Sequence, residues 1–432
     1  MIVLKNGTLI EPATGFLGKK DVVIKGETVM KITDSVNVDE LKSASGEDVK
    51  VYDCTGKYIG PGLVDVHVHF RDPGFTYKED IESGSLAAAK GGFTSVVLMA
   101  NTKPAVDNEE TIRYVLDKGA QTGIHVYTCA NVTKGMKCEE LNDFGTLLKA
   151  GAVGFTDDGV PLLEEELVRN AMKQAVEYDT VLSFHEEDPQ YITNNGINRG
   201  KASEHFGIGG SDRMAEISMV KRDLALALET GAKVNFQHLS TKEAIDLIRE
   251  AKKLPEGKNI HAEATPHHIA LTEADAITHG TLGKMNPPLR EEEDRQAILS
   301  GLMDGTIDLI ATDHAPHSQE EKDKPITDAP SGILGLETAF AIAHKELIEG
   351  KNMEYLQLFC KMSLNPAELY GINAGKVAEK NCADLVVFDP KRDWIIDRFI
   401  SKSQNSPFKN QNLRGKIELT ICQGQIIYDD ME

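Results

Sequence analysis

The stretch LVDVHVHF, residues 63–70, decides the fold and supplies the first candidate metal ligands. Its β-branched and apolar residues predict a buried strand. Successive side chains on a strand point to opposite faces, so we expect His67, His69 and Arg71 to share one face. Two imidazoles at this spacing can bind one metal ion. The stretch therefore predicts a strand that carries a metal site.

Seven further segments resemble this strand, and helical patterns separate them. They are residues 94–101, 124–132, 152–158, 180–187, 233–240, 259–268 and 307–317. Near-continuous apolar strands that alternate with amphipathic helices are typical of a parallel sheet covered by helices. Eight such units within about 250 residues match a (β/α)₈ barrel. The fold class we expect is α/β, with this barrel as its main body.

The two ends of the chain have a different pattern. Residues 1–60 and 375–432 contain short, alternating segments rich in Val, Ile and Thr, separated by turn signals. Each end is too short for a large domain. We expect them to form one small β-sandwich domain together, beside a catalytic barrel domain over residues 61–374.

Composition limits the class of protein. The chain has 432 residues and a formal net charge of −21, which argues against nucleic acid or an anionic membrane as a partner. No secretory signal and no apolar run of membrane-spanning length is present. The six cysteines are scattered without a C-x-x-C pair, as in a reducing compartment. These features predict a soluble, cytoplasmic protein.

Polar residues gather where five of the expected strands end. Beyond His67 and His69 these are Asp157, Asp158, His185, His238, Asp313 and His317. Barrel active sites lie at the carboxyl ends of the strands. Imidazole and carboxylate ligands suit Zn²⁺, which can activate water, and a nearby carboxylate such as Asp313 can move protons. His125 and His261 fall near strand starts, so we expect them to be structural.

One charged segment, residues 318–332, follows the eighth strand. In a barrel it lies at the catalytic face, where it could be a mobile substrate lid or a solvated surface loop. The sequence leaves both readings open.

The segment from Pro61 to Pro104 resembles the signature region of the dihydroorotases, in the amidohydrolase superfamily, with type I-like features. The resemblance continues through GFTDDG (154–159), QHLS (237–240), MNPPLR (285–290) and ATDHAPH (311–317). It implies zinc-dependent, reversible cyclisation of N-carbamoyl-L-aspartate to L-dihydroorotate in pyrimidine biosynthesis. It also implies a homodimer that acts on this small-molecule substrate.

The resemblance assigns roles residue by residue. His67 and His69 would bind one zinc beside Asp313, the general acid/base, and His185 and His238 would bind a second. Asp158 would bridge the two ions, with Asp157 as the alternative. The substrate would meet the following groups: Arg71, Asn101 and His317 at its carboxylate, Asn286 at its ring, and backbone near Gly332.

Two alternatives stay open. Many relatives bridge their metals with a carboxylated lysine on the fourth strand, but here that strand reads Gly154 to Asp158 without lysine. Together with Arg71 this argues against an allantoinase or a hydantoinase. A non-catalytic, dihydroorotase-like scaffold subunit is the other alternative, although every expected ligand position is filled.

Overall fold

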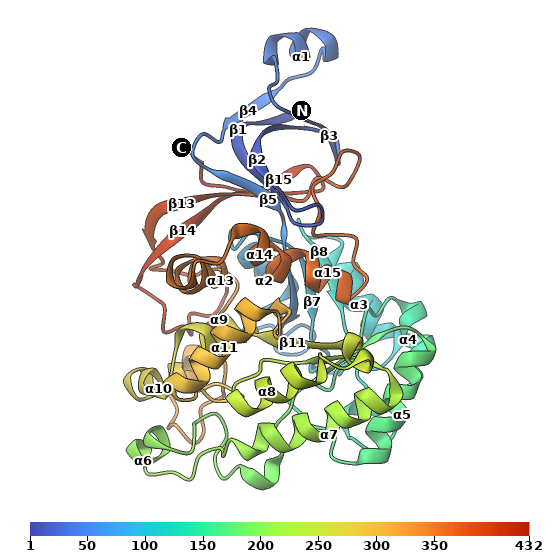
Figure 1. Cartoon of the computed structure of the whole chain (residues 1–432), viewed down its shortest axis with the longest axis vertical. Helices are drawn as coiled ribbons and strands as arrows, with labels where there is room; N and C mark the ends of the chain where they lie inside the picture. Colours follow the sequence, from blue (N-terminus) through green and yellow to red (C-terminus); the bar gives the residue numbers. More distant parts are fainter. Residues whose placement is uncertain (432) are drawn as a thin grey trace.

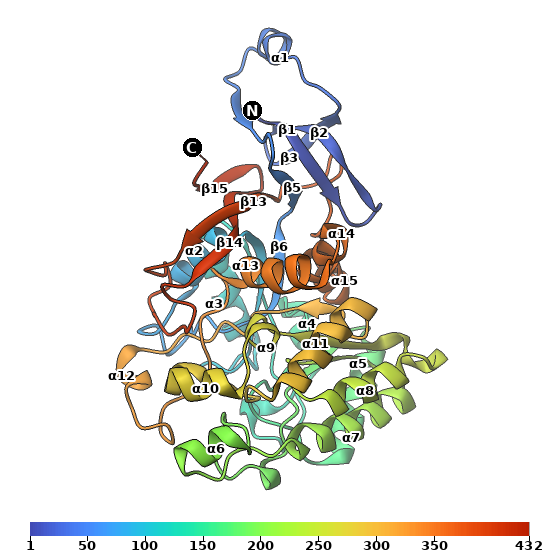
Figure 2. The same cartoon turned by 60° about the vertical axis from the view of Figure 1, so that its left-hand side comes forward.

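The computed structural model describes residues 1–431 and contains a strand barrel with a second sheet above it (Figure 1). Both ends of the chain lie in that second sheet. The view in Figure 2 shows the same two bodies from another side, with β6 running from the upper sheet into the barrel.

The barrel consists of parallel strands that follow one another in chain order. They are β6 (Leu63–Val68), β7 (Phe93–Leu98), β8 (His125–Thr128), β9 (Val181–Phe184), β10 (Lys233–Phe236), β11 (Ile260–Ala264) and β12 (Leu309–Ile310). Phe155 fills the fourth place, with parallel bridges to Ala130 on one side and Leu182 on the other. A parallel bridge between Val68 and His314 closes the ring. The predicted (β/α)₈ barrel is thus confirmed.

A helix follows each barrel position and packs outside the ring. These helices are α2 (Ile81–Lys90), α3 (Glu109–Gly119), α4 (Phe144–Ala150), α5 (Glu165–Glu177), α7 (Met214–Thr230), α8 (Lys242–Ala251), α11 (Glu292–Asp304) and α13 (Ala339–Ala343). In α8 the Thr241 side chain caps the Ala244 N–H, and Ala244, Ile245 and Ile248 are buried at helical spacing. No helix of residues 1–431 is both long and apolar enough to cross a membrane.

Shorter helices decorate the loops and the outer surface. They are α1 (Val38–Ser45), α6 (Lys201–Phe206), α9 (Pro266–Ala270), α10 (Glu273–His279), α12 (Gln319–Lys322), α14 (Tyr355–Phe359) and α15 (Asn365–Leu369). Helix α1 lies within a region for which we expected only strands.

The two ends of the chain join in one sheet of eight strands. They are β1 (Ile2–Glu11), β2 (Phe16–Lys25), β3 (Thr28–Thr33), β4 (Lys50–Asp53), β5 (Tyr58–Pro61), β13 (Leu385–Ile395), β14 (Asn412–Cys422) and β15 (Gln425–Asp429). A bridge between Thr28 and Cys382 ties the edge strand β3 back to the residues before β13. Apolar side chains from both ends, such as Leu4 and Leu419, share one buried cluster. Both ends of the chain therefore contribute to one sheet with a shared apolar cluster.

Several expected strands are longer in the prediction than in the structure. The segment 307–317 contains only the two-residue strand β12, and 259–268 ends in helix α9, which Thr265 caps by accepting the His268 N–H. In both segments the chain stays buried beyond the strand, because the loops at the barrel mouth pack against one another. The polar residues that we placed on strand ends consequently lie mostly just past them.

The return segment between β13 and β14 leaves the terminal sheet and packs on the barrel mouth. Phe408 joins an apolar cluster with Met285, Leu289 and Ile333. Asn405, which is 4% exposed, bonds to the loop that follows β12. Residues that we assigned to the small domain thus reach the candidate site.

Candidate metal centre and substrate pocket

The predicted metal ligands converge at the carboxyl ends of the barrel strands. His67 lies within β6, whereas His69, His185, His238 and Asp313 lie one to three residues beyond their strands. Each of these side chains is buried. His238 and Asp313 have φ values of 32° and 48°. A positive φ is uncommon for residues with a side chain and often occurs at functional sites, where the fold holds a side chain in one direction.

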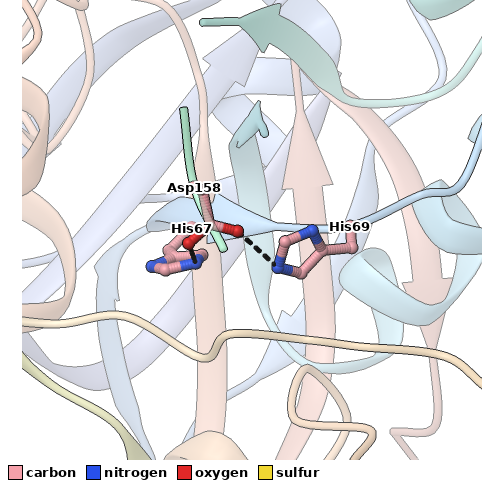
Figure 3. A group of neighbouring side chains, drawn as sticks. All are labelled: His67, His69 and Asp158. Atoms are coloured by element: carbon pink, nitrogen blue, oxygen red, sulfur yellow. Dashed lines mark ion pairs between the residues drawn. The ribbon is translucent and has the colours of Figure 1, made fainter. Parts of the chain in front are cut away.

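Asp158 lies between the imidazoles. Its Oδ2 is 3.4 Å from His69 Nε2 and its Oδ1 is 3.5 Å from His67 Nε2, and Figure 3 shows both oxygens directed at these rings. On its other side, Oδ1 is 3.8 Å from His185 Nδ1 and 4.0 Å from His238 Nε2. One carboxylate thus faces both histidine pairs, as a bridging ligand must.

Asp157 faces away from this cluster. Its carboxylate accepts hydrogen bonds from the Val132 N–H, at 2.9 Å, and from the backbone and hydroxyl of Thr133. These bonds hold the loop after β8 in place. Of the two neighbouring acids, the structure brings Asp158 to the imidazoles and gives Asp157 a structural position.

The second nitrogen of three imidazoles also has a polar neighbour. His69 Nδ1 is 3.0 Å from Asn101 Oδ1, and His185 Nε2 is 3.1 Å from Glu187 Oε2. His67 Nδ1 is 3.4 Å from Glu263 Oε1. Metal-binding histidines commonly direct their other N–H at a carboxylate or carbonyl oxygen, which fixes the ring and the tautomer.

Sequence reasoning missed Glu187 and Glu263. Glu263 is fully buried in β11, where Asn235 donates to its Oε1 at 2.8 Å. A carboxylate on an otherwise apolar barrel strand was the available signal. For Glu187 the signal was its spacing of two residues from His185.

The charges of the cluster favour a cation. Burial alone would raise the pKa of Asp158, yet the imidazoles of His67 and His69 hold it well below its ordinary value. Burial would likewise raise the pKa of Asp313, and the same two rings lower it. The two carboxylates are therefore ionised in a buried position, which requires a compensating positive charge.

The donor set fits a divalent metal. The cluster contains three groups of residues whose ligand atoms lie within 4.8 Å of one another inside each group. They are His67, His69 and Asp158; His67, His238 and Asp313; and Asp158, His185 and His238. Both ring nitrogens of His67 are buried without a hydrogen-bond partner among residues 1–431. A buried imidazole without a hydrogen bond is costly. Metal coordination would satisfy Nε2, and a slightly closer approach of Glu263 Oε1, now 3.4 Å away, would satisfy Nδ1.

A pocket opens above these ligands, and every predicted substrate residue lines it. Its walls include Arg71, Asn101, Asn286, His317 and Gly332, together with His69, Asp158, His185, His238 and Asp313. We expected Arg71 on the strand, but it lies beyond the end of β6, in a turn where its φ is 59°. The turn nevertheless presents it to the same pocket.

Several of these residues already have partners. The Asn101 amide bridges His69 and the Asp158 carboxylate, the latter through Nδ2 at 3.1 Å. The Gly332 N–H donates to Lys284 O at 2.8 Å. In contrast, Asn286 Oδ1 and Ser331 Oγ are buried and have no hydrogen-bond partner among residues 1–431. These two atoms are available to a ligand in the pocket.

His317 is a neutral imidazole surrounded by cations. Burial and the charges of Arg71, Lys322 and Lys78 hold its pKa far below the ordinary value. Its Nε2 lies 2.8 Å from Ser331 O, the distance of a donated hydrogen bond. His317 Nδ1 is 3.4 Å from Lys78 Nζ. Arg71 therefore supplies the basic side of the pocket, and His317 lies between it and Lys78, which pairs with Glu321 Oε1 at 2.7 Å.

Asn405 holds the loops that carry His317 and Gly332. Its Oδ1 accepts the His317 N–H at 3.1 Å, and its Nδ2 donates to Ala315 O at 3.0 Å and Gly332 O at 3.2 Å. Nothing in the local sequence signals this contact, because Asn405 is 88 residues from His317 along the chain.

Segment 318–332 is tied down by two buried lysines. Lys284 donates to Ile326 O and Ala329 O, both at 2.7 Å, and Lys322 donates to Pro330 O and Gly332 O. The helix α12 in this segment is capped by Ser318. The segment therefore has a defined conformation beside the pocket.

The chain resembles known proteins over its whole length. A family model described as "Dihydro-orotase-like" matches residues 56–244. A dihydroorotase of Clostridioides difficile strain 630 is 50% identical over 99% of this chain and 100% of its own length. One from Streptococcus pneumoniae serotype 4 is 44% identical, again over 99% of this chain and all of the relative.

Solved structures share the fold at lower identity. An L-hydantoinase (dihydropyrimidinase) from Arthrobacter aurescens matches with a TM-score of 0.86 and 23% identity, covering 100% of this chain and 96% of that one. A dihydropyrimidinase from Brevibacillus agri matches with a TM-score of 0.83 and 21% identity, over 100% and 95%. At such identity the likeness concerns the fold alone. The full-length relatives decide the family: the chain is a cyclic amide hydrolase that belongs to the dihydroorotases.

Proposed function

We propose that this chain catalyses the reversible cyclisation of N-carbamoyl-L-aspartate to L-dihydroorotate, a step of pyrimidine biosynthesis. The observation that supports this best is the shared pocket of the metal cluster and Arg71. A planar guanidinium is suited to a carboxylate, which dihydroorotate carries and a neutral cyclic amide lacks. We expect a cytoplasmic homodimer, as the resemblance implies.

We infer that the metal is zinc and that two ions bind. His67 and His69 would hold one ion, His185 and His238 the other, and Asp158 would bridge them. Asp313 would contact the first ion. A divalent metal pair supplies Lewis acidity, which polarises an amide carbonyl and makes water a nucleophile at neutral pH.

Asp313 is our candidate for the general acid/base. In the hydrolytic direction water adds to the amide carbonyl of the ring, and the C–N bond breaks. Asp313, whose pKa is held low, is ionised and can accept a proton from the attacking water. It then delivers this proton to the departing ring nitrogen. The reverse sequence closes the ring and releases water.

The remaining pocket residues would bind and orient the substrate. Arg71 would bind the carboxylate, and the unpaired Asn286 Oδ1 could accept a hydrogen bond from a ring N–H. The His317 imidazole and the backbone at Gly332 have partners in this structure, so their contact with substrate requires an exchange of hydrogen bonds. The Asn101 amide would contribute mainly by orienting His69 and Asp158.

Hydrolysis of dihydroorotate, measured with and without a chelator, tests the proposal. We expect turnover that chelation abolishes and added zinc restores. Turnover of allantoin or a hydantoin, with none of dihydroorotate, would instead assign the chain to another cyclic amide. Absence of both bound metal and activity after zinc addition would favour the scaffold alternative.

Substitution Asp313→Ala tests the proton-transfer role. We expect kcat to fall by roughly 10²–10⁴, the usual contribution of a general acid/base. Because Asp313 also touches the metal cluster, bound zinc must be measured in the same samples. Full turnover with normal zinc content would refute the role.

A further inference from the structure

A second cluster of metal-ligating side chains lies at the opposite end of the barrel. His125 is the first residue of β8, and its Nε2 is 3.0 Å from Asp384 Oδ2, just before β13. Cys422, the last residue of β14, completes a group with these two. The three candidate ligand atoms lie within 4.8 Å of one another.

A second thiol adjoins the group. Cys382 Sγ is 3.4 Å from Asp384 Oδ1. None of the six cysteines is in a disulfide within residues 1–431. Two thiols, one carboxylate and one imidazole form a complete tetrahedral ligand set for zinc. Ligand atoms around tetrahedral zinc are roughly 3.3–3.8 Å apart. His125, Asp384 and Cys422 are already close to this spacing, whereas Cys382 Sγ lies outside their group and would have to turn toward it.

The Gln423 side chain faces the other ring nitrogen of His125. Its Nε2 donates to His125 Nδ1 at 3.3 Å in this structure. Metal binding at His125 Nε2 moves the ring proton to Nδ1, so the Gln423 amide would have to turn its oxygen toward Nδ1 to accept it. Asp384 Oδ1 accepts the Gln423 backbone N–H at 2.8 Å, which orients the carboxylate. Burial and the charge of Asp384 raise the pKa of Cys382 to about 12, so thiolates form here only with a compensating cation.

We propose that His125, Cys382, Asp384 and Cys422 bind one thiophilic divalent cation, such as Zn²⁺, that joins the barrel to the terminal sheet. Binding releases two thiol protons, and the proton between His125 Nε2 and Asp384 moves to His125 Nδ1 as the metal takes its place. The site lies at the amino-terminal end of the barrel strands, away from the catalytic pocket, on the face of a barrel that serves stability rather than catalysis. The metal would therefore be structural and independent of the catalytic ions.

Cobalt(II) binding to the full-length protein tests the site. The catalytic cluster offers only imidazoles and carboxylates. Thiolate-to-cobalt charge-transfer absorption therefore reports the second site alone. We expect this absorption in the wild type and its loss in the Cys382→Ser/Cys422→Ser double variant. The matched control Cys138→Ser/Cys360→Ser, which removes two partly exposed thiols elsewhere, should keep it.

A wild-type measurement covers the possibility that the double variant does not fold. Zinc saturation should abolish alkylation of Cys382 and leave the labelling of Cys138 and Cys360 unchanged. Absence of the charge-transfer band in cobalt-saturated wild type, or its persistence in the folded double variant, would overturn the proposal. So would alkylation of Cys382 at the same rate with and without zinc.

Discussion

Substitution Glu263→Gln separates the orienting carboxylate from the ligand that it orients. Glutamine has nearly the same shape, so it can keep the bond from Asn235, which is 2.8 Å long. What it removes is the carboxylate 3.4 Å from His67 Nδ1. Burial raises the pKa of Glu263, and the charge of His67 opposes that rise. An ionised Glu263 orients the His67 ring and increases the basicity of Nε2, the nitrogen that faces Asp158 and Asp313.

The expected loss is 10- to 100-fold in zinc affinity, the usual effect of removing such a partner. This corresponds to about 1.4–2.7 kcal/mol. Competition against a chromogenic chelator measures the affinity, and we expect one of the two ions to be released at lower chelator concentration. Kinetics at saturating zinc should recover most of the activity, because no ligand has been removed.

Another buried acid provides a control. Glu186 belongs to none of the groups of candidate ligands, and burial and the neighbouring Asp223 raise its pKa well above the ordinary value. Glu186→Gln should therefore leave zinc affinity unaltered. Equal affinities of the wild type and Glu263→Gln would refute the reasoning, because Glu263 would then be a structural acid only.

Three further substitutions test the pocket and its supports. Arg71→Met should raise KM about 10- to 100-fold through loss of a charge-assisted hydrogen bond to the substrate carboxylate. The KM of a substrate analogue without the carboxylate should rise less, and equal rises for both compounds would make Arg71 structural. Asn405→Ala leaves the His317 N–H and the Ala315 carbonyl unsatisfied, at about 1–3 kcal/mol each, whereas the Gly332 carbonyl keeps its bond from Lys322. The substitution should therefore raise KM and lower the unfolding temperature, and an unchanged KM would exclude a positioning role. Burial lowers the pKa of Lys322 to about 7, below its value of about 10.4 in an unfolded chain. The unfolded state therefore binds more protons between these values, and the wild type should gain stability over Lys322→Met as pH rises through this range; parallel stability curves would contradict it.

The sequence was sufficient to predict the barrel because the pattern of an apolar strand followed by a helix is repeated along the chain. Eight apolar segments with helices between them admit few other arrangements, although the segment around Phe155 is reduced to one bridged residue. Strand ends were placed too late, since mouth loops such as 311–317 stay buried after strand pairing has stopped. Element type depends on local pattern, whereas element length depends on where neighbouring strands stop pairing.

The candidate site, like the fold, could be predicted from the sequence only in part. Residues carried by a motif, such as His67, His69 and Asp313, could be placed at one end of the barrel from the sequence alone. The choice between Asp157 and Asp158 could not, because adjacent residues point in opposite directions and only the fold decides which faces inward. Asn405 could not be found from spacing at all, since it comes from a loop between two strands of the other sheet.

The path of that loop restricts how the protein could be divided. A fragment cut to the expected barrel, residues 61–374, would keep all the candidate ligands and Arg71. It would lose Asn405 and the apolar contact of Phe408 with the mouth loops. The barrel therefore depends on the terminal sheet for part of its pocket. A chimera that exchanges barrels between related enzymes would keep the pocket intact only if the loop between β13 and β14 were exchanged together with the barrel.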